Sequence, residues 1–120
     1  MKQLTKAEEE IMQVLWQLQS ANVKEIIHEL PKPKPAYNTV STIVRILESK
    51  GFVDYEKQGK GHIYFPVIPK QEYSNQSINK LVDNYFQGSF KSMVSFFVKK
   101  NDVDLQDLEA VLKEINKKDE

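Results

Sequence analysis

The sequence predicts a mainly α-helical protein that contains one small β-hairpin. Three observations lead to this fold class. Apolar residues recur at helical spacing in three stretches before residue 51. Two segments with strand composition then flank a connection that contains glycine, and beyond Pro69 the spacing is helical again.

The first helix is expected in "LTKAEEEIMQVLWQL", residues 4–18. Thr5 followed by Glu8 is a capping-box pattern, which places the start of the helix just after Thr5. Trp16 lies off the centre of the apolar side, so we expect it to pack at the edge of the core. The apolar side itself is formed by Leu4, Ala7, Ile11, Val14, Leu15 and Leu18.

A short second helix is expected in "SANVKEIIHEL", residues 20–30, and the prolines of "PKPKPA", residues 31–36, end it. The third helix should run from about residue 37 to residue 50, with Gly51 at its C-terminal end. The predicted inner side of the second helix holds Val23, Ile26, Ile27 and Leu30, and that of the third holds Val40, Ile43, Val44 and Leu47.

The outer side of the third helix carries Asn38, Ser41, Thr42 and Arg45. Exposed helix faces are usually filled with Glu, Lys and Gln, which favour the helix more than Asn, Ser and Thr do. Short polar side chains let a helix approach base edges closely, and an arginine can bind guanine or a phosphate. The sequence therefore favours a recognition helix, and the alternative is a solvated face that happens to be rich in Ser and Thr.

A β-hairpin should follow. "FVDYEK", residues 52–57, alternates, "HIYFPVI", residues 62–68, is rich in β-branched and aromatic residues, and "QGKG" connects them. Three helices closed by a two-stranded ribbon make a winged helix, a variant of the helix-turn-helix. This order of elements, over residues 1–70, strengthens the interpretation of the third helix as a recognition helix.

Basic residues in and around these elements are the predicted phosphate contacts. The chain as a whole has no net charge, but residues 32–62 hold six Lys and Arg against three Asp and Glu. A wing places its basic side chains beside the groove, where they add affinity but little sequence information. For each of them the alternative is an ordinary solvated side chain. The predicted contacts are Lys32, Lys34, Lys50, Lys57, Lys60 and His62.

Residues 71–120 predict helices alone and form the second expected domain. About fifty residues with this many large apolar side chains have too little core of their own, so we expect a two-fold dimer with a shared core. A small-molecule pocket among Tyr85, Phe90 and Phe97 is the alternative. The predicted dimerisation residues are Ile78, Leu81, Val82, Tyr85, Phe86, Phe90, Met93, Val94, Phe97, Leu105, Leu108, Leu112 and Ile115.

Several function classes are disfavoured by composition. No cysteine is present, and no apolar run approaches the roughly 18 residues that span a membrane, so we expect a cytoplasmic protein without membrane insertion. His28 and His62 lie in different elements without a second ligand at metal spacing, and no nucleophile–base pair or phosphate-binding loop is visible. We therefore expect neither an enzyme nor a protein with a metal or cofactor.

The chain resembles the penicillinase-repressor family of bacterial transcriptional regulators, which includes the beta-lactamase and methicillin-resistance repressors. The resemblance covers nearly the whole length. It rests on "LTKAEEEIMQVLW", "NTVSTIVRILESKGFV" and the helical segment "SFKSMVSFFVKKNDVDLQDLEAVL".

The resemblance implies a homodimeric repressor whose winged helices bind a palindromic operator on double-stranded DNA and block transcription. It implies a recognition helix from Asn38 to Lys50 that faces the groove through Asn38, Thr39, Ser41, Thr42 and Arg45. Family members often carry an arginine where Ile46 stands here, whereas this chain has Arg45 one position earlier.

The resemblance also implies a route of induction. Repressors of the lactam type are cut in the dimerisation domain, between an asparagine and a phenylalanine, in response to a membrane-bound sensor metalloprotease. The matching bond is Phe96–Phe97, with Phe96 in place of the asparagine. Copper-responsive relatives bind the metal through a cysteine-rich tail, which this chain lacks.

Two other functions remain open at the level of sequence. One is a winged-helix module that binds protein, with the aromatic C-terminal helices as its docking surface and zero net charge in its favour. The other is a regulator that senses a small molecule.

Overall fold

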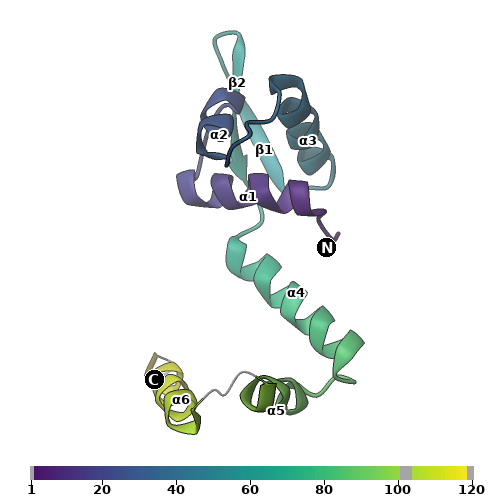
Figure 1. Cartoon of the computed structure of the whole chain (residues 1–120). Coiled ribbons are helices and arrows are strands. Elements are labelled where there is room, and N and C mark those ends of the chain that lie inside the picture. The colour runs from purple at the N-terminus through teal and green to yellow at the C-terminus, as the bar shows by residue number, and fades with distance from the viewer. Residues whose placement is uncertain (1, 101–103, 119–120) are drawn as a thin grey trace. The chain divides into compact units, whose positions relative to one another are not determined.

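The computed structural model describes residues 2–100 and 104–118 (Figure 1). The predicted fold class is confirmed, because these residues form helices and one two-stranded antiparallel hairpin. The chain divides into two compact units, residues 1–76 and 77–120. The elements are α1 (Lys6–Leu18), α2 (Val23–Glu29), α3 (Tyr37–Ser49), β1 (Val53–Gln58), β2 (Gly61–Pro66), α4 (Lys70–Tyr85), α5 (Phe90–Lys100) and α6 (Leu105–Lys118).

The first unit encloses a core between α1, α2, α3 and the hairpin (Figure 1). Trp16 packs at the edge of this core, as expected from its position on α1. The expected inner position of Ala7 is wrong, because Ala7 is exposed and Glu8 of the same turn is buried. The largest fully buried side chains are Phe52, Met12, Leu15, Ile26, Leu47, Val40 and Val44.

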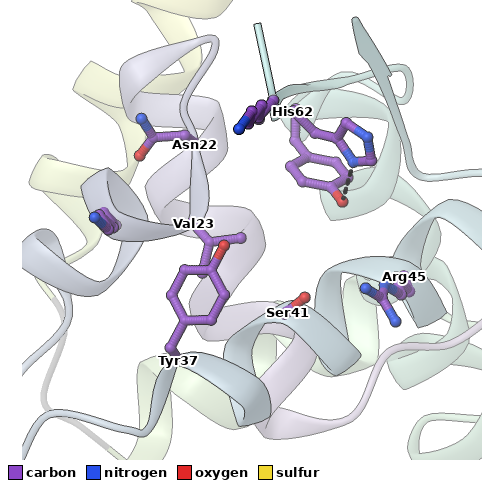
Figure 2. A pocket seen from close by; sticks show the side chains of 10 residues that line it. Asn22, Val23, Tyr37, Ser41, Arg45 and His62 are labelled. Carbon is purple, nitrogen blue, oxygen red and sulfur yellow. Dashed lines mark hydrogen bonds between the residues drawn. The ribbon is translucent and has the colours of Figure 1, made fainter. Parts of the chain in front are cut away.

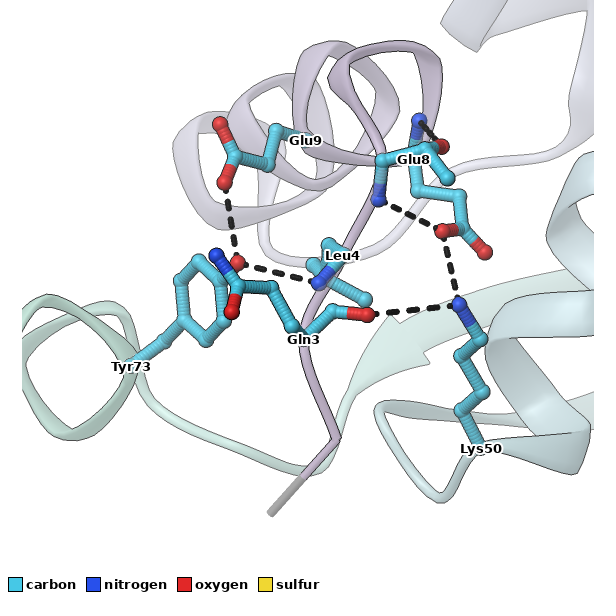
Figure 3. A network of polar contacts seen from close by, with 7 residues as sticks. Gln3, Leu4, Glu8, Glu9, Lys50 and Tyr73 are labelled. Atoms are coloured by element: carbon cyan, nitrogen blue, oxygen red, sulfur yellow. Dashed lines mark hydrogen bonds and ion pairs between the residues drawn. The ribbon is translucent and has the colours of Figure 1, made fainter. Parts of the chain in front are cut away.

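The predicted capping box at the start of α1 is present, and it also reaches α3. Glu8 Oε1 accepts a hydrogen bond from the Thr5 amide at 2.7 Å and another from Lys50 Nζ at 2.8 Å (Figure 3). Thr5 Oγ1 in turn accepts from the Glu8 amide at 3.2 Å. The first turn of α1 is therefore joined to the end of α3 through a single carboxylate oxygen.

The first turn of α4 belongs to the same unit through Tyr73, which is buried. Its hydroxyl accepts from the Leu4 amide at 3.1 Å and donates to Glu9 Oε1 at 2.9 Å (Figure 3). Its ring meets Phe52 edge-on, with centroids 5.6 Å apart. We therefore propose that the winged-helix domain extends beyond the predicted boundary at residue 70 to Gln76.

The hairpin is fixed to the helices by a third extended segment. Ala21, between α1 and α2, exchanges two backbone hydrogen bonds with Tyr64 of β2, at 2.9 and 2.8 Å. Within the hairpin, Val53 pairs with Pro66 and Gln58 with Gly61. Gly59, at the tip, has a φ of +62°, which glycine adopts without steric cost. The hairpin is thus held at the middle of β2, while its tip is exposed.

The second unit exposes most of its apolar side chains. Among its residues with described burial only Val82 is buried, while Tyr85 is 75% and Phe90 60% exposed. The rings of Phe86 and Phe96 lie 5.6 Å apart, but α5 has no buried residue. Leu105, Leu112 and Ile115 of the predicted dimerisation set lie outside the residues whose side chains are described.

The described helices do not include one that is both long enough and apolar enough to cross a membrane.

The Glu8–Lys50 pair generates a prediction about stability and pH. Burial alone would raise the pKa of Glu8, but the hydrogen bonds from Lys50 and Thr5 outweigh it, so the pKa lies below its ordinary value of 4.5. A carboxylate whose pKa is lowered by folding stabilises the protein above the unfolded-state pKa. This contribution should decline as the pH falls below about 4.5 and vanish once it passes the lower pKa of the folded state.

We expect Glu8→Gln to lower the free energy of unfolding by about 2 kcal/mol at pH 7 and to flatten its decline in acid. Thermal denaturation between pH 3 and pH 7 measures both effects. Glu10→Gln, an exposed position on the same helix, is the control. Equal stability of Glu8→Gln and the unmodified chain at pH 7 would contradict this account of the pair.

Candidate nucleic-acid interface

The two sides of α3 differ completely in exposure. Val44 and Leu47 have no exposed surface and Val40 has 1%, so the inner side is fixed in the core. Four of the five predicted base-contacting residues are exposed, and Ser41 is half-buried. We call the outer side, which also includes the exposed Ile46, the outer face of α3: Asn38, Thr39, Ser41, Thr42, Arg45 and Ile46.

The start of α3 lacks the side-chain cap that α1 and α2 possess. Asn22 and Glu25 form a capping box on α2, like that of Thr5 and Glu8 on α1. The residue before α3 is Ala36, which makes no side-chain hydrogen bond to the helix. The first amides of a helix carry a partial positive charge, so this end favours an anion nearby.

Thr42 has already used its one hydroxyl proton within α3. Its Oγ1 donates to the carbonyl oxygen of Asn38 at 2.8 Å. A threonine hydroxyl has one proton, so in this conformation Thr42 can offer an external ligand only acceptor lone pairs and its methyl group.

A groove of about 370 Å³ lies between α2, α3 and the hairpin (Figure 2). Lys24, Arg45 and Lys60 contribute three positive charges to its lining, and none of the lining residues is acidic. Such a surface attracts anions. The full lining is Asn22, Val23, Lys24, Tyr37, Ser41, Arg45, Lys60, Gly61, His62 and Tyr64.

Aromatic packing positions His62 on the hairpin side of this groove (Figure 2). Its ring stacks on Tyr55 with centroids 4.5 Å apart, and its Nδ1 lies 3.4 Å from the Tyr64 hydroxyl. Burial, helped by the negative charge of Glu48, raises the pKa of Tyr64, so this hydroxyl stays neutral at physiological pH. The imidazole is thus held between two tyrosines.

The structure brings together only part of the predicted phosphate-contacting set. Lys60 and His62 line the groove with Arg45 and Ser41. Lys57 lines a different hollow, which also contains Glu25 and Glu56. Lys32 is exposed on the loop before α3.

Two predicted phosphate contacts have structural partners instead. Lys50 forms the ion pair with Glu8 and is largely covered. Lys34 donates to the carbonyl oxygen of His28 at 2.6 Å and to that of Leu30, so it satisfies the C-terminal end of α2. Both lysines therefore have a structural role within the fold, and their contact with a phosphate stays a prediction.

Sequence reasoning missed Asn22 and Lys24 in the groove. The capping box of Asn22 and Glu25 was the available signal, because it marks where α2 begins. It does not reveal that this end of α2 meets the hairpin, which depends on the pairing of Ala21 with Tyr64.

Comparison with known families places the chain clearly. The family model described as penicillinase repressor matches residues 4–117. The methicillin resistance regulatory protein MecI of Staphylococcus aureus strain N315 is 27% identical over 97% of this chain and 95% of the relative. The penicillinase repressor of Bacillus licheniformis is 29% identical, over 93% of this chain and 91% of the relative.

Two solved repressor structures are similar to part of this chain. The DNA-binding domain of the repressor BlaI is similar with a TM-score of 0.53 and 35% identity, over 59% of this chain and 88% of that one. Monomeric BlaI of Bacillus licheniformis, solved in complex with the blaP half-operator, gives a TM-score of 0.50 and 34% identity over 60% and 89%.

The contacts of Lys34 predict a purely structural effect. We expect Lys34→Ala to lower the free energy of unfolding by about 1 kcal/mol, because two carbonyl groups at the end of α2 lose their donor. Chemical denaturation measures this, with Lys32→Ala on the same loop as the control. A role in phosphate binding alone would leave the stability of both variants unchanged, and that result would contradict the assignment of Lys34.

Proposed function

This chain belongs to the penicillinase repressor family, and we propose that it represses transcription by binding a palindromic DNA operator as a homodimer. The observation that carries the proposal is the outer face of α3, exposed beside a groove with three basic residues and no acidic ones. Proteins of this family are repressors and not enzymes.

The outer face of α3 supplies the groups that bind base edges in a major groove. Asn38 can pair with adenine, and Arg45 can donate to guanine. Arg45 also lines the groove beside α3, so its guanidinium is available to a phosphate as well. The buried inner side of α3 holds these groups in fixed register.

The groove beside α3 fits the sugar-phosphate backbone. Lys24 of α2 and Lys60 of the hairpin supply positive charge from two elements that flank α3, and Asn22 and Tyr37 supply polar groups. Phosphate contacts of this kind position a protein on DNA without reading sequence. The similarity to monomeric BlaI solved in complex with a half-operator supports the same use here.

The second unit supports the homodimer. Among its described residues, the apolar side chains lie on helices in which only Val82 is buried, and exposed apolar surface of this kind marks a site of protein interaction. A second copy of the same helices would cover them, and a two-fold axis would then present two α3 helices to two half-sites. The ligand-pocket alternative has less support, because Tyr85, Phe90 and Phe97 are all exposed.

Induction by cleavage, as the family resemblance implies, would act on this second unit. The Phe96–Phe97 bond lies inside α5, and the centroids of the two rings are 5.7 Å apart. A protease acts on locally opened chain, so α5 would have to unfold locally before a sensor-triggered protease could cut there.

Sequence-specific binding tests the proposal directly. Selection from a random duplex pool with the full chain should recover a palindrome with a fixed spacer. Replacing both Thr42 and Arg45 by Ala should reduce the preference for that site over scrambled DNA about 100-fold or more, because each base contact contributes on the order of 1–3 kcal/mol.

In the matched control, Lys6 and Gln13, two exposed residues of α1, are replaced by Ala. This variant should keep the preference for the selected site over scrambled DNA. Binding is measured over a range of salt concentrations, since phosphate contacts make it strongly salt-dependent. Failure to select any site, even at low salt, would overturn the proposal and favour a module that binds protein. Loss of the dimer in the Thr42/Arg45 variant would assign the outer face of α3 to the dimer interface and contradict its role in DNA binding.

Truncation separates the two units. Residues 1–76 should fold as a monomer that binds the selected site far more weakly than the full chain, since one half-site gives only part of the binding energy. Residues 1–70 should be less stable because they lack Tyr73, which fills the core and satisfies the Leu4 amide. Sedimentation measures the oligomeric state, thermal denaturation the stability, and titration with the selected duplex the affinity. A 1–76 fragment that binds as tightly as the whole chain would rule out the dimer.

A further inference from the structure

We propose that Ile46 recognises the methyl group of a thymine, a role that rests on the DNA-binding function proposed above. The proposal adds a specificity-determining residue that has no hydrogen-bonding group. It is based on the exposure of Ile46, on its position on α3 and on the hydrogen bond that the Thr42 hydroxyl donates within the helix.

Ile46 is 42% exposed, although the next residue, Leu47, has no exposed surface. It therefore belongs to the outer face of α3 and not to the core. A single exposed isoleucine is common on protein surfaces. This one, however, lies on the same side of the helix as Asn38, Thr42 and Arg45, where close approach to DNA is expected.

Thr42 extends the apolar character around Ile46. The two residues are four apart on the helix, which places their Cβ atoms about 5–6 Å from each other. Because the Thr42 hydroxyl donates its proton to Asn38, the methyl group of Thr42 and the side chain of Ile46 are neighbouring groups that cannot donate a hydrogen bond.

The chemistry of the major groove identifies one partner for this pair. Each base edge presents hydrogen-bonding groups there, and thymine also presents its C5 methyl group. Ile46 could contact the other edges only by displacing water from donors or acceptors without replacing it, which is unfavourable. Contact with a thymine methyl group removes apolar surface of both the side chain and the base from water.

Deoxyuridine tests this contact, because it differs from thymidine only in lacking the methyl group. Starting from the selected operator, each thymine of a half-site is replaced in turn by deoxyuridine, and the affinity of the full chain is measured. At one position per half-site the affinity should fall about fourfold, the effect of one buried methyl group. Substitution of both half-sites together should give about sixteenfold.

Ile46→Ala should abolish the discrimination between thymidine and deoxyuridine at that position alone. Val67→Ala is the matched control, because Val67 is also an exposed aliphatic residue but lies beyond the hairpin strands. It should retain the full effect. Ile46→Ala should fold normally, since the side chain is outside the core and alanine favours the helix.

The outcomes separate the inference from the proposed function. An operator that is selected but is insensitive to deoxyuridine, or equally sensitive in Ile46→Ala, overturns the role of Ile46 and leaves the repressor proposal intact. A change in dimerisation in Ile46→Ala would assign this residue to a protein contact and also overturn the inference. If no operator can be selected, both proposals fail.

Discussion

Three side chains on the inner side of α3, Val40, Val44 and Leu47, determine where every group on its outer face lies. All three are essentially without exposed surface, and a helix with one side fixed in this way cannot rotate about its axis. If α3 rotated about its axis by the angle between two successive residues, buried aliphatic side chains would be exposed to water. The polar residues opposite are therefore presented in one orientation, although few contacts of their own hold them.

Hydrogen bonds between elements also hold the first unit together. Glu8 joins the end of α3 to the start of α1 through Lys50, and Tyr73 joins the first turn of α4 to Leu4 and Glu9. Both contacts are remote from the groove beside α3. They join α1, the end of α3 and the first turn of α4 within the first unit, and none of their residues lines the groove.

The fold was predictable from the sequence because it depends on local patterns. The apolar periodicity gave the three helices of the first unit, Thr5 and Glu8 gave the start of α1, and the glycine-containing connection gave the hairpin. The outer face of α3 was predictable for the same reason. Which basic residues have partners within the fold was not predictable, because those partners lie in other elements that a local pattern does not reveal. Lys50 is paired with a carboxylate 42 residues away, and Lys34 with carbonyl groups of the preceding helix.

The pairing of Ala21 with Tyr64 attaches the connection between α1 and α2 to the middle of β2 through a single β-bridge. The amide of each residue donates a hydrogen bond to the carbonyl oxygen of the other, and both residues are buried. Such amides exchange with solvent only when the surrounding structure opens as a whole. We therefore expect the amides of Ala21 and Tyr64 to be among the slowest of the hairpin to exchange, and those of the exposed tip around Gly59 to be among the fastest.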